Sequence, residues 1–182
     1  MKKLYFTFVL AVLWIFSIQA QTYYVINPTP VFTPKSSPIE VAALYSADFN
    51  ITQKNTIRQD YEDAYDDIVV LGEATRTYNC HNFAWHIADG GTATAWMNQI
   101  DITNGPNVAK YWTDGSFIEV CNESESSKIF YFTGDHSAIM STISGYYDSK
   151  WGPDILVRHA PTNLPGIYVP ADRRYFASIL LR

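Results

Sequence analysis

The stretch TYNCHNFAWHIADGG, residues 77–91, contains one of the two cysteines of the chain and two of its four histidines. Asn79 suits the N-cap of a helix, because its side chain can accept a hydrogen bond from a first-turn N–H group. Gly90 and Gly91 suit the end of that helix, where glycine is the most favoured residue. We therefore predict a helix over residues 80–89 that carries its cysteine in the first turn.

Cys80 lies at the edge of the core-facing side of this predicted helix. The residues three, four, seven and eight positions later are all apolar: Phe83, Ala84, Ile87 and Ala88. First-turn N–H groups and the helix dipole stabilise negative charge, which lowers the pKa of a thiol and raises its thiolate fraction. Cys80 is therefore a candidate nucleophile. A disulfide with Cys121 is the alternative, because an oxidising compartment favours the pairing of two cysteines.

A histidine in the motif GDHSAIM is the candidate partner of this cysteine. His136 begins a predicted strand directly after a Gly-Asp turn, so it can project from a sheet edge toward a helix N-terminus. There it can act as a general base toward Cys80. A third polar group is needed to orient the imidazole. Three residues are candidates for that role, and the strand register decides among them: His159, Asp148 and Ser149.

The motifs TYNCHNFAWH, GDHSAIM and SKWG with LVRHAP resemble, in order and spacing, those of exported bacterial proteins related to the papain-like NlpC-type and CHAP-type amidases. The resemblance covers residues 75–161. In that family a cysteine opens a helix, a histidine begins a following strand, and a polar residue on the next strand orients the histidine. The resemblance implies Cys80 as nucleophile and His136 as base, with the third role on His159 ahead of the other two candidates. The chain departs from the family in its longer connection between the cysteine helix and the histidine strand.

The order of the predicted elements indicates an α+β fold, with N-terminal helices packed on a small antiparallel sheet. The resemblance implies that the core is papain-like. Helices are predicted from Ser37, an N-cap before Pro38, and through the acidic stretch that follows residue 51. Strands are predicted for the runs KIFYF, HSAIMSTI and ILVRH. Residues 21–50, rich in Pro, Thr and Ser, are predicted to form an extended N-terminal arm, and residues 51–182 the hydrolase domain.

Residues 1–20 are predicted to be a signal peptide. Lys2 and Lys3 precede an apolar run, residues 4–18, that ends near the small residue Ala20. We therefore expect a secreted or periplasmic protein with no stable membrane insertion after cleavage. The formal net charge of the chain is −5, and no basic run exceeds two residues. This pattern argues against nucleic acid as a partner.

Four further side chains are predicted to contact a substrate: Asn79, His81, Lys150 and Trp151. His81 is expected near the rim of the cleft, and Trp151, beside Lys150, is expected to line the groove. No metal site is predicted, because His81 and His86 would point about 140° apart on a helix. No His-x-x-x-His or Cys-x-x-Cys spacing occurs either, and no cofactor is predicted.

These observations favour an exported cysteine hydrolase that cleaves an amide bond through an acyl-enzyme. The resemblance alone implies a peptidoglycan stem peptide or another short peptide as the substrate. The main alternative is a catalytically inactive papain-like module that binds ligands at the cell surface, with Cys80 and Cys121 joined in a disulfide. A purely structural surface protein is a further, weaker alternative.

Overall fold

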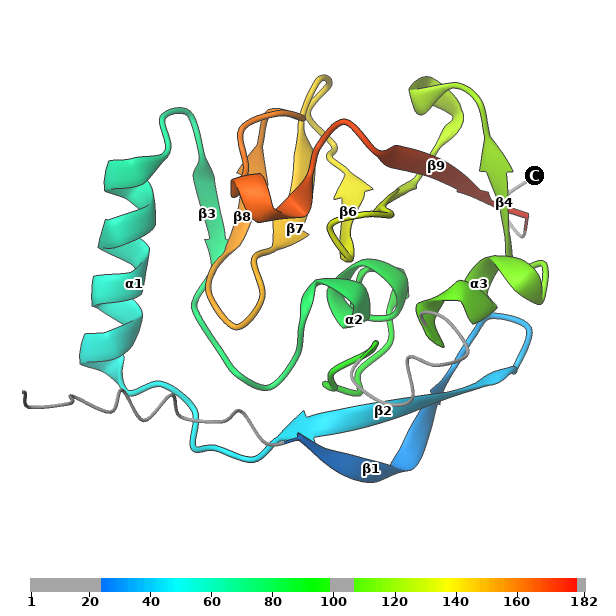
Figure 1. The fold of residues 1–182 in the computed structure, drawn as a ribbon, viewed down its shortest axis with the longest axis horizontal. Coiled ribbons are helices and arrows are strands. Elements are labelled where there is room, and N and C mark those ends of the chain that lie inside the picture. The colour runs from blue at the N-terminus through cyan, green and yellow to red at the C-terminus, as the bar shows by residue number, and fades with distance from the viewer. Residues whose placement is uncertain (1–23, 99–106, 180–182) are drawn as a thin grey trace, which may run out of the picture.

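A computed structural model describes residues 24–98 and 107–179 of the chain, so the predicted signal peptide lies outside the described residues. The described residues form two antiparallel sheets and several short helices (Figure 1). The strands are β1 (Tyr24–Phe32), β2 (Pro38–Leu44), β3 (Val69–Gly72), β4 (Phe117–Val120), β5 (Lys128–Tyr131), β6 (His136–Met140), β7 (Tyr147–Lys150), β8 (Leu156–His159) and β9 (Arg173–Ser178). The helices are α1 (Ile51–Ala64), α2 (Cys80–Trp85) and α3 (Lys110–Thr113), with 3₁₀ turns η1 (Ile87–Asp89), η3 (Asn107–Ala109), η4 (Glu123–Glu125) and η5 (Gly166–Tyr168).

The described chain begins with a β-hairpin, in which β1 pairs antiparallel with β2. The helix predicted from Ser37 is therefore wrong. Side chains along β2 alternate between exposed and buried positions, and Ile39 and Val41 are both fully buried. A period of two residues fits a strand with one buried face, and it outweighs the local helix-capping signal.

The larger sheet has seven strands in the order β3-β8-β7-β6-β5-β9-β4, and every neighbouring pair is antiparallel. The predicted strands KIFYF, HSAIMSTI and ILVRH correspond to β5, β6 and β8. Four strands of this sheet were not among the predicted ones: β3 at one edge, β7 between β8 and β6, and β9 and β4 at the other edge. His136 begins β6, as the sequence predicted. Strand β6 is the middle strand of the sheet.

Helix α1 begins with a capping box. The Asn50 side chain accepts a hydrogen bond from the backbone N–H of Gln53, and the Gln53 side chain accepts one from the backbone N–H of Asn50. The two bonds satisfy donors that a helix N-terminus otherwise leaves unpaired. Helix α1 stands beside β3, the strand at the other edge of the large sheet (Figure 1).

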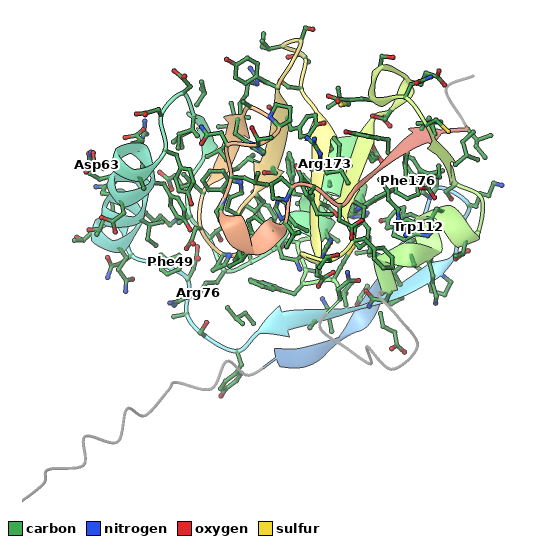
Figure 2. The ribbon with its side chains drawn as sticks, turned by 45° about the horizontal axis from the view of Figure 1, so that its top comes forward. Phe49, Asp63, Arg76, Trp112, Arg173 and Phe176 are labelled. Carbon is green, nitrogen blue, oxygen red and sulfur yellow. The ribbon has the colours of Figure 1, made fainter. Side chains whose placement is uncertain are left out.

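Helix α2 lies between the large sheet and the hairpin (Figure 1). It joins them in one hydrophobic cluster, which contains residues from α2, from both hairpin strands, from α3 and from the sheet: Val31, Ile39, Val41, Phe83, Ala84, Trp85, Ala95, Met97, Val108, Tyr111, Phe117, Phe130 and Phe176. Trp112 of α3 packs against this cluster and stacks on Phe176 of β9, with ring centroids 4.8 Å apart (Figure 2). Both faces of α2 are therefore covered, and all six of its residues are buried.

The opposite face of the large sheet carries a second hydrophobic cluster. Adjacent residues of β5 separate the two faces, because Phe130 belongs to the first cluster while Ile129 and Tyr131 belong to the second. Tyr61 of α1 packs against this second cluster and meets Trp151 edge-on, with ring centroids 5.2 Å apart. The large sheet is thus a central layer with an aromatic-rich core on each side.

The architecture is α+β, with an antiparallel sheet as its main layer. The helices are few and are not grouped as an N-terminal layer on the sheet, so that part of the predicted fold is wrong. In the part of the chain that the structure describes, no helix is both long enough and apolar enough to cross a membrane.

Candidate active site

Asn79 caps α2 and also ties the helix to a distant segment. Its side-chain oxygen accepts hydrogen bonds from the backbone N–H groups of Asn82 (3.2 Å) and Met97 (3.3 Å), and its amide group donates to the carbonyl of Met97 (2.9 Å). The predicted N-cap is therefore present. The α-helix ends at Trp85, four residues earlier than predicted, and a 3₁₀ turn continues as far as Gly90, which has a φ of 90°.

The loop before α2 is fixed by charged side chains from other elements. Asp48 accepts hydrogen bonds from the backbone N–H of Arg76 (2.8 Å) and the hydroxyl of Thr75 (3.0 Å). The guanidinium of Arg76 lies 4.0 Å from the centre of the Phe49 ring, and Figure 2 shows the two residues near the foot of α1. From β7, the Lys150 ammonium donates to the carbonyl of Thr75 (3.3 Å). These contacts hold the chain that leads into Cys80.

Cys80 is the first residue of α2, and its side chain is buried with 5% of its surface exposed. Burial alone raises the pKa of a thiol. The positive charges of His81 and His136 outweigh burial and lower the pKa of Cys80 well below its ordinary value. Two imidazoles therefore stabilise the thiolate. A helix as short as α2 has a weak dipole, so the two histidines replace the predicted dipole as the main source of stabilisation.

His136 is fully buried, and its ring lies flat against Tyr168 of η5. The two ring centroids are 3.8 Å apart with an interplanar angle of 16°. Within the described residues, neither ring nitrogen of His136 has an oxygen or nitrogen hydrogen-bond partner. Its ring interacts electrostatically with Cys80, Asp135 and His159. The structure thus brings together the two residues predicted as nucleophile and base.

His81 is also buried, and both of its ring nitrogens have partners. Its Nε2 lies 3.2 Å from Oδ1 of Asp135, and its Nδ1 lies 2.8 Å from the hydroxyl oxygen of Ser137. Burial lowers the pKa of a histidine, but the negative charge of Cys80 and the hydrogen bond and charge of Asp135 outweigh it, so the pKa of His81 is raised. His81 therefore lies within the site and not at its rim.

The candidates for the third role are engaged with one another or with the strand beside them. Ser149 and His159 form a hydrogen bond of 2.9 Å between Oγ and Nε2, and Nδ1 of His159 lies 2.8 Å from the carbonyl of Ala160. Asp148 makes a two-pronged ion pair with Arg158, at 2.8 and 3.0 Å. Among the described contacts, none joins a ring nitrogen of His136 to any of these three side chains, and the third role stays a prediction for each.

The remaining predicted substrate-contact residues are buried. The Lys150 ammonium donates to the carbonyls of Gly152 (2.9 Å) and Asp154 (2.5 Å) in addition to that of Thr75. Trp151 belongs to the second hydrophobic cluster, and its indole N–H donates to Ser149 (3.0 Å). Asn79 and His81 are buried as well. The contact of these four residues with substrate stays a prediction.

Both cysteines are free. Cys80 is buried and Cys121 is exposed, so the disulfide considered for the inactive binding module is absent from this structure. Among the residues that the structure describes, no group of three or more histidine, cysteine and acidic side chains is arranged to hold a metal ion.

Three contacts of the site were not anticipated from the sequence: the carboxylate of Asp135, the hydroxyl of Ser137 and the ring of Tyr168. Asp135 and Ser137 flank His136 in the chain, so their position beside the predicted base was the available signal. Tyr168 comes from a segment that the sequence marks only by its prolines and glycine. The comparisons with known proteins add no further residues, because no family model, curated protein or solved structure matches this chain.

Proposed function

We propose that this chain is an exported cysteine hydrolase with a papain-like, NlpC-type core that cleaves an amide or peptide bond. The observation that carries the proposal is the buried Cys80 at the start of α2, together with the buried imidazoles of His81 and His136, whose charges lower the pKa of its thiol. A structural cysteine in an apolar core would have a raised pKa and little nucleophilicity. Reactive cysteines characteristically lie beside an imidazole.

In the proposed reaction, the Cys80 thiolate attacks the carbonyl carbon and forms a C–S bond. His136, protonated, donates its proton to the amide nitrogen as the C–N bond breaks, and the amine leaves. The thioester is then attacked by water, whose proton passes to His136. The C–S bond breaks, the carboxylic acid leaves and the thiolate and the protonated His136 are restored. A proton shuttle needs a nitrogen that is free to exchange, and His136 has no competing oxygen or nitrogen partner among the described residues.

The proposed substrates are peptidoglycan stem peptides or other short peptides, on the basis of the sequence motifs of the NlpC-type and CHAP-type amidases. The absence of a Cys80–Cys121 disulfide removes the observation that would have favoured an inactive binding module.

The proposal is tested with Cys121→Ser as the parent protein, in which Cys80 is the sole thiol. Incubation with muropeptides or short peptides should release amine, and rapid acid quenching should trap an acyl adduct on Cys80 detectable by mass spectrometry. Cys80→Ala should lose roughly 10⁴-fold or more of the activity, and His136→Ala roughly 10²–10⁴-fold. Substrate binding that survives in Cys80→Ala, with no turnover and no adduct in the parent protein, would identify a binding module instead.

A further inference from the structure

The two imidazoles at Cys80 have different surroundings, and this difference carries an inference that rests on the proposed function. His136 has no oxygen or nitrogen partner among the described residues. His81 is held at both ring nitrogens, by Asp135 and by Ser137. A ring that must exchange protons with substrate needs a free nitrogen, whereas a ring that must hold a charge in place needs fixed partners.

The hydroxyl of Ser137 lets His81 be protonated or neutral without losing a hydrogen bond. The indole N–H of Trp85 can only donate, and it donates to Ser137 Oγ at 2.9 Å. The hydroxyl keeps one lone pair and its own proton for Nδ1 of His81. The hydroxyl can accept a hydrogen bond from the protonated ring or donate one to the neutral ring. This hydrogen bond therefore favours neither form of His81.

The carboxylate of Asp135 favours the protonated form of His81. Oδ1 of Asp135 lies 3.2 Å from Nε2 of His81 and also accepts a hydrogen bond of 2.8 Å from the side-chain amide of Asn98. Burial would raise the pKa of this carboxyl group, but the hydrogen bond and charge of His81 and the bond from Asn98 lower it. Asp135 has a φ of 43°, in the left-handed region, which orients its side chain at the turn before β6.

The remaining titratable groups that face the sulfur are Lys150 from β7 and Tyr168 from η5, since each interacts electrostatically with Cys80. The Lys150 ammonium is held by three backbone carbonyls, and Tyr168 covers His136. Both are kept unchanged in the experiment below. The charge of His81 lowers the pKa of Cys80 at least as much as the charge of His136 does.

We propose that His81, oriented and charged by Asp135, is a second catalytic imidazole that holds the Cys80 sulfur as a thiolate, while His136 moves the proton. The charges and protons balance at every step. In the resting site the thiolate and Asp135 offset protonated His81 and protonated His136. In the acyl-enzyme the sulfur is neutral, His136 has given its proton to the leaving amine, and the His81–Asp135 pair is neutral in sum. The proton on His81 stays in place throughout.

The test measures the thiolate directly and needs no substrate. In the Cys121→Ser parent, the ultraviolet absorbance of the Cys80 thiolate is titrated against pH, and the same is done for His81→Gln, Asp135→Asn and His136→Gln. His81→Gln should raise the midpoint by roughly 1–3 pH units, since it removes a positive charge that stabilises the thiolate. Asp135→Asn should raise it by a smaller amount, and His136→Gln should abolish turnover. Asp89→Asn is the matched control, because that carboxylate pairs with Lys128 and should leave the midpoint unchanged.

A midpoint within a few tenths of a unit of the parent in both His81→Gln and Asp135→Asn would overturn the inference. A merely structural His81 would alter stability and leave the midpoint in place. If His81→Gln does not fold, Asp135→Asn decides alone, since its side chain is 53% exposed and the amide keeps the shape of the carboxylate. Shifts as expected with no amide hydrolysis by the parent would instead refute the proposed function and leave the thiolate assignment standing.

Discussion

Three buried histidines lie near one another in this protein, and the atoms around each ring set its chemistry. His81 has an acidic partner that favours the protonated ring. His136 is stacked on an aromatic ring with both nitrogens free of oxygen and nitrogen partners in the described part of the chain. His159 is neutral because burial lowers its pKa, and its two partners fix the tautomer of the neutral ring. The carbonyl of Ala160 can only accept, so Nδ1 carries the proton, and Nε2 accepts from Ser149.

The neutral His159 makes stability depend on pH. Burial lowers its pKa to about 4 from the ordinary 6.5. The unfolded chain therefore binds a proton between these two values that the folded protein does not, and stability from this residue is full above pH 6.5 and is lost as the pH falls toward 4. The loss amounts to at most about 3 kcal/mol. Urea unfolding at pH 7.5 and pH 4.5 should show a smaller pH-dependent loss in His159→Gln than in the parent.

One result would contradict the prediction for His159. If His159→Gln and the parent lose equal stability between the two pH values, His159 is protonated in the folded protein, and its bond to Ser149 is not the one described. The comparison uses the difference between two proteins, so acidic groups that titrate in both cancel.

At the scale of single elements, Lys150 links the loop before α2 to the turn between β7 and β8. Its ammonium is fully buried and donates to the carbonyls of Thr75, Gly152 and Asp154. Burial lowers the pKa of this group to about 7, against the opposing negative charges of Asp154, Cys80 and Asp48. This side chain fixes the loop that leads into Cys80, which explains a buried lysine in an interior strand of the large sheet.

Replacing Lys150 should lower the free energy of unfolding. Lys150→Met keeps the length of the side chain but leaves three carbonyls without their donor, so we expect a loss of about 3 kcal/mol in the free energy of unfolding. Lys110→Met is the matched control, because the ammonium of Lys110 donates to one exposed carbonyl, that of Pro38, and its loss should cost less than about 0.5 kcal/mol. Denaturant unfolding of both variants measures the difference; equal midpoints would show that the Lys150 contacts do not support the loop.

The elements of the site were predictable where their signals are local. Asn79 before Cys80, and the Gly-Asp turn before His136, each mark the start of an element through backbone chemistry that a few residues define. The pairing of His81 with Asp135 was not predictable, because it depends on how α2 is rotated against β6 once the hairpin and sheet close around it. The partners of His159 were missed for a related reason: the register of β7 and β8 aligns Ser149 with its ring, and a shift of one residue would turn it away.

In the N-terminal segment, a local helix signal and a strand pattern of burial predict different structures. Ser37 and Pro38 form a local helix-start signal, yet Ile39 and Val41 alternate with exposed residues and form a strand. The strand is favoured because it buries both β-branched side chains against α2, and that gain is not available to an isolated helix turn. Residues 21–50 were predicted as an extended arm; within the described part they form a hairpin that shares a core with the sheet.

At the scale of the whole molecule, the site depends on three layers meeting at α2. The hairpin covers one side of α2, and the large sheet, with Ser137 and His136, covers the other. If the hairpin, α2 and the large sheet unfold as one cooperative unit, a substitution that destabilises the hairpin must also lower the stability of the sheet. If the hairpin is an attached arm, the sheet should unfold as before.

Ile39→Ala separates these two cases. Ile39 is fully buried beside residues of α2 in the first cluster, so its truncation should cost about 2–5 kcal/mol. Because the cluster spans all three layers, the loss should appear as a lower midpoint of a single urea transition that is the same by far-ultraviolet circular dichroism and by tryptophan fluorescence. Ile51→Ala, at a site with 63% exposure, should change the midpoint little. An unchanged main transition in Ile39→Ala, with an early separate change of small amplitude, would show that α2, with Cys80, is held by the sheet alone.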